Sequence, residues 1–126
     1  KIVLMSSARG LLGHPAGYSA YCASKSAVDG ITKALGCEWG DTGITVNAIC
    51  PGYVLTPLIE AQIPEQMKVH GMDRETVLRE VMLLRQPSRQ FATVEQIGGT
   101  AVYLCSPAAD QGTGTTISVD GGWTAL

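Results

Sequence analysis

The 126-residue sequence predicts an α/β fold: part of a doubly wound parallel sheet, with three strands, flanking helices and a helical lid. Two observations predict it. Three short apolar runs of strand length, at 1–5, 44–50 and 114–119, alternate with longer segments of helical periodicity. That order is typical of parallel strands joined by crossover helices, and right-handed crossovers are expected for both connections.

The first third of the chain predicts a strand, a loop and a long helix. The run Lys1–Met5 is apolar after its first residue, as in a strand buried on both faces. Residues 6–17 are rich in Gly, Ser and Pro and predict a loop, and a helix is expected from about Ser19 to Trp39. The expected buried stripe of this helix consists of Ala20, Ala27, Val28, Ile31 and Leu35.

The middle third predicts a strand followed by an insertion. The strand Ile44–Cys50 stops at Pro51-Gly52. Residues 53–90 are more charged and carry three prolines, which predicts two short helices, near 58–63 and 74–84. Segments of this kind between regular elements are often lids over a binding site.

The last third predicts a helix and a strand. Thr93 and Gln96 form a capping-box signature at the start of the helix. The last strand, 114–119, is followed by a turn at Asp120–Gly122. The expected apolar face of the helix consists of Ile97, Ala101, Val102 and Leu104.

Composition argues against several classes of function. The net charge is −2 at pH 7, so no nucleic-acid surface is expected, and no apolar run reaches the roughly 20 residues of a membrane span. The four cysteines form no CxxC pair and the two histidines no HxxxH pair, so no metal site is expected. We expect the cysteines to be reduced, mostly buried thiols of a cytoplasmic protein. Because Lys1 opens directly into a core strand, we expect further residues upstream of it.

Tyr21 and Lys25 stand four residues apart on the predicted long helix, so their side chains project from one face. A free tyrosine titrates at about pH 10 and is a poor base at neutral pH. An ammonium group one turn away favours the phenolate, which makes the pair a usable general acid and base. A structural tyrosine beside a solvated lysine has the same spacing, so neighbouring signals must decide between the two.

Two strand ends supply those signals. Ser6-Ser7 ends the first strand and Pro51-Gly52 the second, and parallel α/β sheets bind ligands outside the C-terminal ends of their strands. We therefore expect a serine hydroxyl, the tyrosine hydroxyl and the lysine ammonium to meet in one crevice. An ordinary loop role for Ser6-Ser7 stays open at this point.

Four motifs occur together in the chain: Ser7-Ala-Arg-Gly10, Tyr21-Cys-Ala-Ser-Lys25, Ile44–Gly52 and Ser118-Val-Asp-Gly-Gly122. In order and approximate spacing this set resembles the short-chain dehydrogenase/reductase family, along essentially the whole chain. The resemblance implies that residues 1–126 are the C-terminal catalytic half of one Rossmann-fold domain. It also implies that 53–90 is the substrate lid and that the dinucleotide-binding half lies outside this sequence.

The resemblance implies roles for individual residues. Tyr21 is the acid/base for the substrate oxygen, Ser7 holds that oxygen, and Lys25 also bonds the nicotinamide ribose of the cofactor. NAD is the implied cofactor, with NADP as the alternative, and a homotetramer is the implied assembly. The residues implied to fix the nicotinamide carboxamide are Pro51, Gly52, Val54 and Thr56.

Within the family, the motifs Pro51–Leu58, Gln86–Arg89 and Val119–Ala125 are similar to those of bacterial D-3-hydroxybutyrate dehydrogenases. This similarity implies oxidation of D-3-hydroxybutyrate to acetoacetate. Gln62 and Trp123 are then expected to line the substrate pocket. Core packing is the alternative for Trp123.

Three positions depart from that group: Arg9, Tyr18 and Tyr53 stand where it has His, Lys and Trp. The first two positions contact the substrate carboxylate there. Arginine binds a carboxylate bidentately, so Arg9 is expected to bind the acid beside Tyr18, and an ordinary solvated cation is the alternative. Another hydroxy acid, a neutral alcohol or a 3-oxoacyl thioester therefore stays open as substrate, and so does a non-catalytic dinucleotide-binding or interaction protein.

Overall fold

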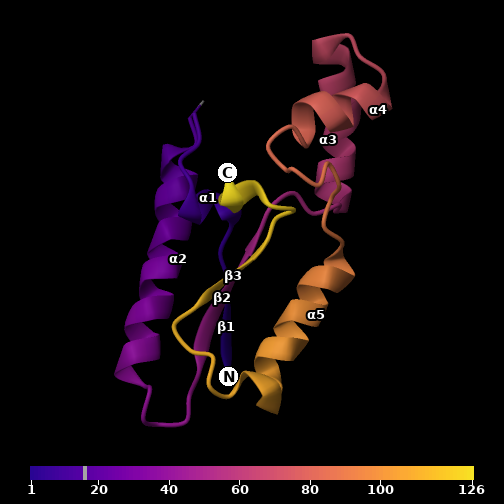
Figure 1. Cartoon of the computed structure of the whole chain (residues 1–126). Coiled ribbons are helices and arrows are strands. Elements are labelled where there is room, and N and C mark those ends of the chain that lie inside the picture. The colour runs from indigo at the N-terminus through magenta and orange to yellow at the C-terminus, as the bar shows by residue number, and fades with distance from the viewer. Residues whose placement is uncertain (16) are drawn as a thin grey trace.

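A three-stranded parallel sheet in the order β1-β2-β3 forms the centre of the molecule (Figure 1). The computed structural model, which describes residues 1–15 and 17–126, places β1 at Ile2–Met5, β2 at Val46–Pro51 and β3 at Thr116–Val119. Met5 pairs with Ile49, which pairs with Ile117, so the C-terminal ends of β1 and β2 lie at the same end of the sheet. The predicted fold class is confirmed.

Helices make up most of the remaining chain. They are α1 (Ala8–Leu11), α2 (Ser19–Glu38), α3 (Pro57–His70), α4 (Arg74–Val77), a π-helix (Leu78–Met82), α5 (Val94–Cys105) and two 3₁₀ turns (Pro107–Ala109, Trp123–Ala125). The expectation of a loop over 6–17 was wrong for one helical turn, because the side chain of Ser7 caps α1. Among the described residues, no helix is both long and apolar enough to cross a membrane.

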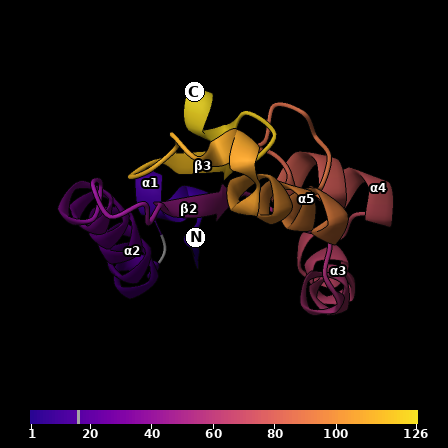
Figure 2. The same ribbon diagram turned by 90° about the horizontal axis from the view of Figure 1, so that it is seen from below.

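The helices α2 and α5 lie on opposite faces of the sheet (Figures 1 and 2). Alternate side chains of β2 show the same division: Ile49 packs against Leu104 of α5, and the next residue, Cys50, bonds to Asp29 of α2. The connection from β1 to β2 and the one from β2 to β3 move across the sheet in the same direction. Because their helices lie on opposite faces, the two crossovers have opposite hands. The expectation of two right-handed crossovers was wrong, because the connection through α5 is the rare left-handed kind.

The buried face of α2 differs from the expected apolar stripe. Its fully buried positions are Asp29, Thr32 and Gly36, whereas Ile31 is 52% exposed. The expectation was also wrong for Ala20 and Ala27, which are exposed, while Val28 and Leu35 are half-buried. The reason is close packing: a Cβ at Gly36 would lie 2.5 Å from the Cα of Gly114, so small side chains face the sheet and larger ones turn away.

The start of α5 confirms the predicted capping box of Thr93 and Gln96. Ile97, Ala101 and Leu104 pack into the core around Ile49. Val102 is 71% exposed, so its assignment to the apolar face was wrong. One residue beyond Ala101, it is rotated by about 100° around the helix and points away from the sheet.

The insertion lies beyond the C-terminal ends of the strands, above α5 in Figure 1. A helix is present at both expected places, near 58–63 and 74–84. The first, α3, is longer than expected: it continues through Pro64 to His70 and ends at Gly71 in the left-handed conformation. Proline removes one backbone bond from a helix interior. Burial of Ile63 against Val77 and Met82 offsets that loss, because these three side chains form the core of the insertion.

Candidate active site

Most of the predicted site residues line one cavity at the C-terminal ends of β1 and β2. Its volume is about 390 Å³. It brings together residues from four separate segments, which agrees with the expected binding position in a parallel α/β sheet. The predicted residues that line it are Ser7, Arg9, Tyr18, Tyr21, Gly52, Val54, Thr56, Gln62 and Trp123.

Two predicted residues do not line this cavity. Pro51 is the last residue of β2, directly before the lining Gly52. Lys25 lies one turn along α2 from Tyr21, with its Nζ 5.8 Å from the centroid of the tyrosine ring. Any influence of Lys25 on the cavity would therefore pass through its neighbour Tyr21 or through a bound cofactor.

Ser7 is held between the end of β1 and the first turn of α1. Its Oγ accepts a hydrogen bond from the Arg9 amide at 3.2 Å, and the residue is 9% exposed. The position of α1 depends on Gly10: a Cβ there would lie 2.6 Å from Asp29 Oδ2 and 2.9 Å from the Lys25 carbonyl carbon. Glycine thus lets α1 approach α2 closely, and Ser7 and Tyr21 come to face one cavity.

Tyr21 and Lys25 are anchored by the strand end as well as by their helix. Lys25 Nζ donates to the carbonyl of Met5 at 3.0 Å, and Ser6 Oγ donates to the carbonyl of Lys25 at 3.1 Å. These two bonds tie α2 to the end of β1 in both directions. The ammonium keeps two further protons for other acceptors, and Tyr21, 43% exposed, presents its ring to the cavity.

Arg9 crosses the cavity inside a group of aromatic rings. Its guanidinium carbon lies 3.8 Å from the centroid of Tyr18 and 5.8 Å from that of Trp123. One terminal nitrogen donates to the hydroxyl of Tyr53 at 3.3 Å. Within residues 1–15 and 17–126 no carboxylate forms an ion pair with this guanidinium. It is therefore a fixed cation able to bind an anionic group that enters the cavity.

Trp123 belongs to both the core and the cavity wall. The residue is 7% exposed, yet it lines the cavity and stacks on Tyr53 with a centroid distance of 5.7 Å and an interplanar angle of 6°. The two interpretations of Trp123 are thus compatible. The stacked pair forms an aromatic part of the cavity wall.

Three lining residues, Tyr53, Leu58 and Ile59, are absent from the set predicted from sequence. The last two follow Thr56, whose side chain caps α3 by accepting from the Ile59 amide. Thr56-Pro57 is a recognisable helix start, with proline at the first helical position. That signal defines the register of α3, in which Ile59 and Gln62 share a face toward the cavity.

The backbone at Val54 fits the carboxamide of a nicotinamide ring. Tyr53 and Leu55 bond to Ala92 on one side, through the Tyr53 carbonyl (2.9 Å) and the Leu55 amide (3.0 Å). Peptide geometry then turns the N–H and C=O of Val54 to the opposite side, and Val54 lines the cavity. A neighbouring donor and acceptor of this kind complement the acceptor and donor of a primary amide.

Of the four cysteines only Cys50 is buried, while Cys37 and Cys105 are exposed, so the expectation of mostly buried thiols was wrong. Cys50 belongs to a buried polar pair behind Ser7, between α2 and β2. Cys50 Sγ donates to Asp29 Oδ1 at 3.6 Å, and both residues are buried. Burial, followed by the charge of Asp29, raises the pKa of the Cys50 thiol to about 11. Cys50 is therefore protonated at neutral pH and acts as a hydrogen-bond donor, not as a nucleophile.

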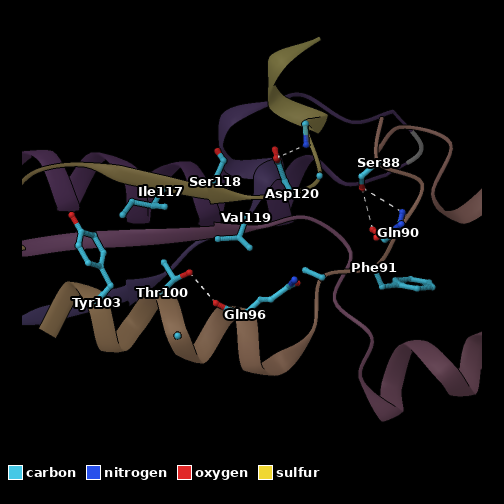
Figure 3. A pocket seen from close by; sticks show the side chains of 14 residues that line it. Ser88, Gln90, Phe91, Gln96, Thr100, Tyr103, Ile117, Ser118, Val119 and Asp120 are labelled. Carbon is cyan, nitrogen blue, oxygen red and sulfur yellow. Dashed lines mark hydrogen bonds between the residues drawn. The ribbon is translucent and has the colours of Figure 1, made fainter. Parts of the chain in front are cut away.

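A larger cavity, of about 820 Å³, lies between α5 and β3 (Figure 3). Two of its polar side chains are engaged with their own neighbours: Asp120 accepts from the Gly122 amide, and Thr100 donates to the Gln96 carbonyl. It contains no acid/base pair and no cation among its lining residues. The smaller cavity is the candidate active site because the chemistry-bearing side chains meet there.

Comparisons with known proteins identify relatives along almost the whole chain. A family profile described as Enoyl-(Acyl carrier protein) reductase matches residues 1–124. The D-beta-hydroxybutyrate dehydrogenase of Rhizobium meliloti (strain 1021) is 50% identical over 125 residues, which are 99% of this chain and 48% of that protein. The chain thus spans about half the length of this curated relative.

Solved structures of other oxidoreductases also match the chain along nearly its whole length. A short chain dehydrogenase family protein from Francisella tularensis has a TM-score of 0.88 at 29% identity, covering 99% of this chain and 51% of its own. A putative 2-deoxy-d-gluconate 3-dehydrogenase from Agrobacterium tumefaciens, with bound NADP, has a TM-score of 0.81 at 38% identity. The match covers 98% of this chain and 46% of that one. A 4-hydroxyisoleucine dehydrogenase complexed with NADH has a TM-score of 0.81 at 33% identity, and the match covers 99% of this chain and 47% of that one.

Proposed function

The chain belongs to the short-chain dehydrogenase/reductase family, and we propose that it forms the catalytic part of an oxidoreductase acting on a secondary alcohol or ketone. The observation that carries this proposal is the meeting of Ser7, Tyr21 and the free peptide edge of Val54 around one cavity. Residues 1–126 are proposed as the catalytic half of one Rossmann-fold domain, with 53–90 as its lid.

The proposed chemistry divides between the side chains and a nicotinamide cofactor. The cofactor, when bound, supplies the hydride acceptor or donor, and the backbone of Gly52 and Val54 would hold its carboxamide. During oxidation Tyr21 takes the proton from the substrate hydroxyl, while Ser7 Oγ hydrogen-bonds the same oxygen. The ammonium of Lys25 favours the tyrosine phenolate and donates its remaining hydrogens to the cofactor ribose. NAD is the proposed cofactor and NADP the alternative.

The proposed substrate is a short 3-hydroxy acid, with D-3-hydroxybutyrate first. A carboxylate two bonds from the reacting carbon would reach from Tyr21 toward Arg9, whose charge has no acidic partner within the described part of the chain. Gln62 adds an amide from α3, and Trp123 closes the far wall. A neutral secondary alcohol is the second candidate, favoured by Tyr18, which places an aromatic ring where related enzymes have a second cation.

The decisive experiment uses the full-length protein. Purified enzyme with NAD is expected to oxidise D-3-hydroxybutyrate, and Tyr21→Phe is expected to lower kcat by at least about 100-fold, because general acid–base catalysis contributes about 10²–10⁴-fold. Tyr103→Phe, which alters an exposed tyrosine on α5, is the matched control and should be unchanged. Cofactor binding without turnover of any hydroxy acid or alcohol would refute the proposal.

Assembly and location follow from the same proposal. A homotetramer and a cytoplasmic location are proposed by analogy with the family, with a small molecule as the ligand and neither nucleic acid nor membrane as a partner. Sedimentation of the full-length protein measures the first. A monomer at micromolar concentration would contradict it.

A further inference from the structure

Gln86 is a buried amide that none of the proposed chemistry uses. It lies in the segment between the π-helix and α5 and is 1% exposed. Both ends of its side chain are engaged: Oε1 accepts from the Tyr53 amide at 2.5 Å, and Nε2 donates to the Gln90 carbonyl at 2.6 Å. One partner lies 33 residues away and the other four residues away, so this buried amide fixes its own loop against the start of the lid.

The segments that Gln86 joins are the two ends of the lid and the C-terminal turn. Tyr53 begins the lid and Gln90 ends it. Gly52 and Gly121 make room for the side chain, since a Cβ on them would lie 2.5 Å from Gln86 Oε1 and 3.1 Å from its Nε2, respectively. Figure 3 shows Ser88 and Gln90 beside the turn that carries Asp120, and the Ser88 amide donates to the Gly121 carbonyl at 3.0 Å.

This junction sets the positions of the residues around Arg9. Tyr53, whose amide Gln86 holds, offers the hydroxyl that accepts from Arg9 and the ring that stacks on Trp123. Trp123 follows directly on the turn that packs against Gln86. The relative position of Tyr53 and Trp123, and through Tyr53 that of the guanidinium, therefore depends on one amide outside the cavity.

We propose that Gln86 is a positioning residue for the acid-binding side of the site: its amide holds Tyr53, and thereby Arg9, where a substrate carboxylate must bind. The inference rests on the proposed function for its consequence in catalysis, although the junction itself does not. Gln86 touches neither the substrate nor the reacting atoms.

The test compares Gln86→Met with Gln90→Met in the full-length protein. The first keeps the length of the side chain and removes both hydrogen bonds. The second makes the same change at an exposed residue that bonds to Gln86 and Ser88 through its backbone alone. Two quantities are measured: the ratio of kcat/KM for D-3-hydroxybutyrate to that for its methyl ester, and amide hydrogen exchange in peptides covering 53–55 and 46–50. Gln86→Glu, which keeps the acceptor for Tyr53, is the second variant if Gln86→Met does not fold.

Gln86→Met is expected to lower the acid-to-ester ratio by about tenfold, the effect of weakening one charged contact in the transition state. Exchange at 53–55 is expected to rise while exchange at 46–50, in β2, is unchanged, and Gln90→Met should alter neither. Unchanged exchange at 53–55, an equal loss for acid and ester, or unfolding of both variants would overturn the inference. If the wild-type protein oxidises neither compound, D-3-hydroxybutyrate fails as the proposed substrate, and the exchange measurement still tests the role of Gln86.

Discussion

Replacing Arg9 by methionine tests which part of the substrate this site recognises. The change removes the guanidinium that lies 3.8 Å from the Tyr18 centroid and donates to Tyr53, and it keeps an unbranched apolar side chain. Arg9 has no acidic partner within the described part of the chain, so its removal leaves no buried carboxylate unpaired. The effect of Arg9→Met should therefore fall on the ligand and only weakly on folding.

The size of the effect follows from the contact that is lost. A hydrogen bond to a charged group contributes about 1.5–3 kcal/mol, which corresponds to a loss of roughly 10- to 150-fold in kcat/KM for D-3-hydroxybutyrate. The methyl ester carries no charge, and its kcat/KM is expected to change by less than about threefold, within the range of an altered neutral contact. Arg9→Lys should lie between, since an ammonium keeps the charge but lacks the planar fork.

The assay is the initial rate of cofactor reduction by the full-length enzyme, with the acid and the ester measured in parallel. Arg85→Met, which removes an exposed arginine on the lid, is the matched control and should leave both rates unchanged. Equal losses for acid and ester would show that Arg9 supports the shape of the cavity only. An unchanged rate with the acid would show that the carboxylate binds elsewhere.

Two further predictions concern the packing behind the site. In a denaturant titration, Gly36→Ala should lower the free energy of unfolding by about 1–3 kcal/mol, because the added Cβ would lie 2.5 Å from the Cα of Gly114 and only backbone could move aside. Gly30→Ala, whose added Cβ meets nothing within 4 Å, should raise the free energy of unfolding by about 0.5–1 kcal/mol in the same titration. Cys50, with its pKa raised to about 11, binds its proton more tightly in the folded than in the unfolded chain, so its contribution to stability is complete below about pH 9 and is lost as pH rises toward 11. Unfolding midpoints across that range should fall less steeply for Cys50→Ala than for wild type, and alkylation of the native protein at pH 8 should modify the two exposed cysteines and spare Cys50.

The fold was predictable where local chemistry determines it. The apolar strands and the capping box at Thr93 depend on near neighbours, and the structure confirms both. The buried face of α2 was not predictable, because a prediction from hydropathy places large apolar side chains toward the core. Here Gly36 meets Gly114 so closely that the sheet-facing positions are small or polar, and Ile31 turns outward. The hand of the crossover through α5 also lies outside any local pattern, since it depends on which face of the sheet the helix covers.

The cavity was predictable to the extent that strand ends converge. Ser7 and Gly52 follow two strands, and the parallel arrangement alone brings them together. Gln86 was not predictable, because its partner Tyr53 lies 33 residues away and its environment consists of glycines in other segments. A glutamine before Pro87 in a polar stretch resembles an exposed residue, and only the tertiary structure places it in the interior.

The two sides of the cavity are held by different means. The side proposed for proton transfer is fixed by the sheet: Lys25 bonds to the end of β1, and Ser7 caps the turn that follows it. The side proposed for acid binding is fixed by contacts among side chains, since Arg9 contacts Tyr18 and Tyr53, which come from different segments. A change at any one of these three positions alters the packing of the other two. The proposed acid-binding side can therefore change while the contacts that hold Ser7 and Lys25 stay the same.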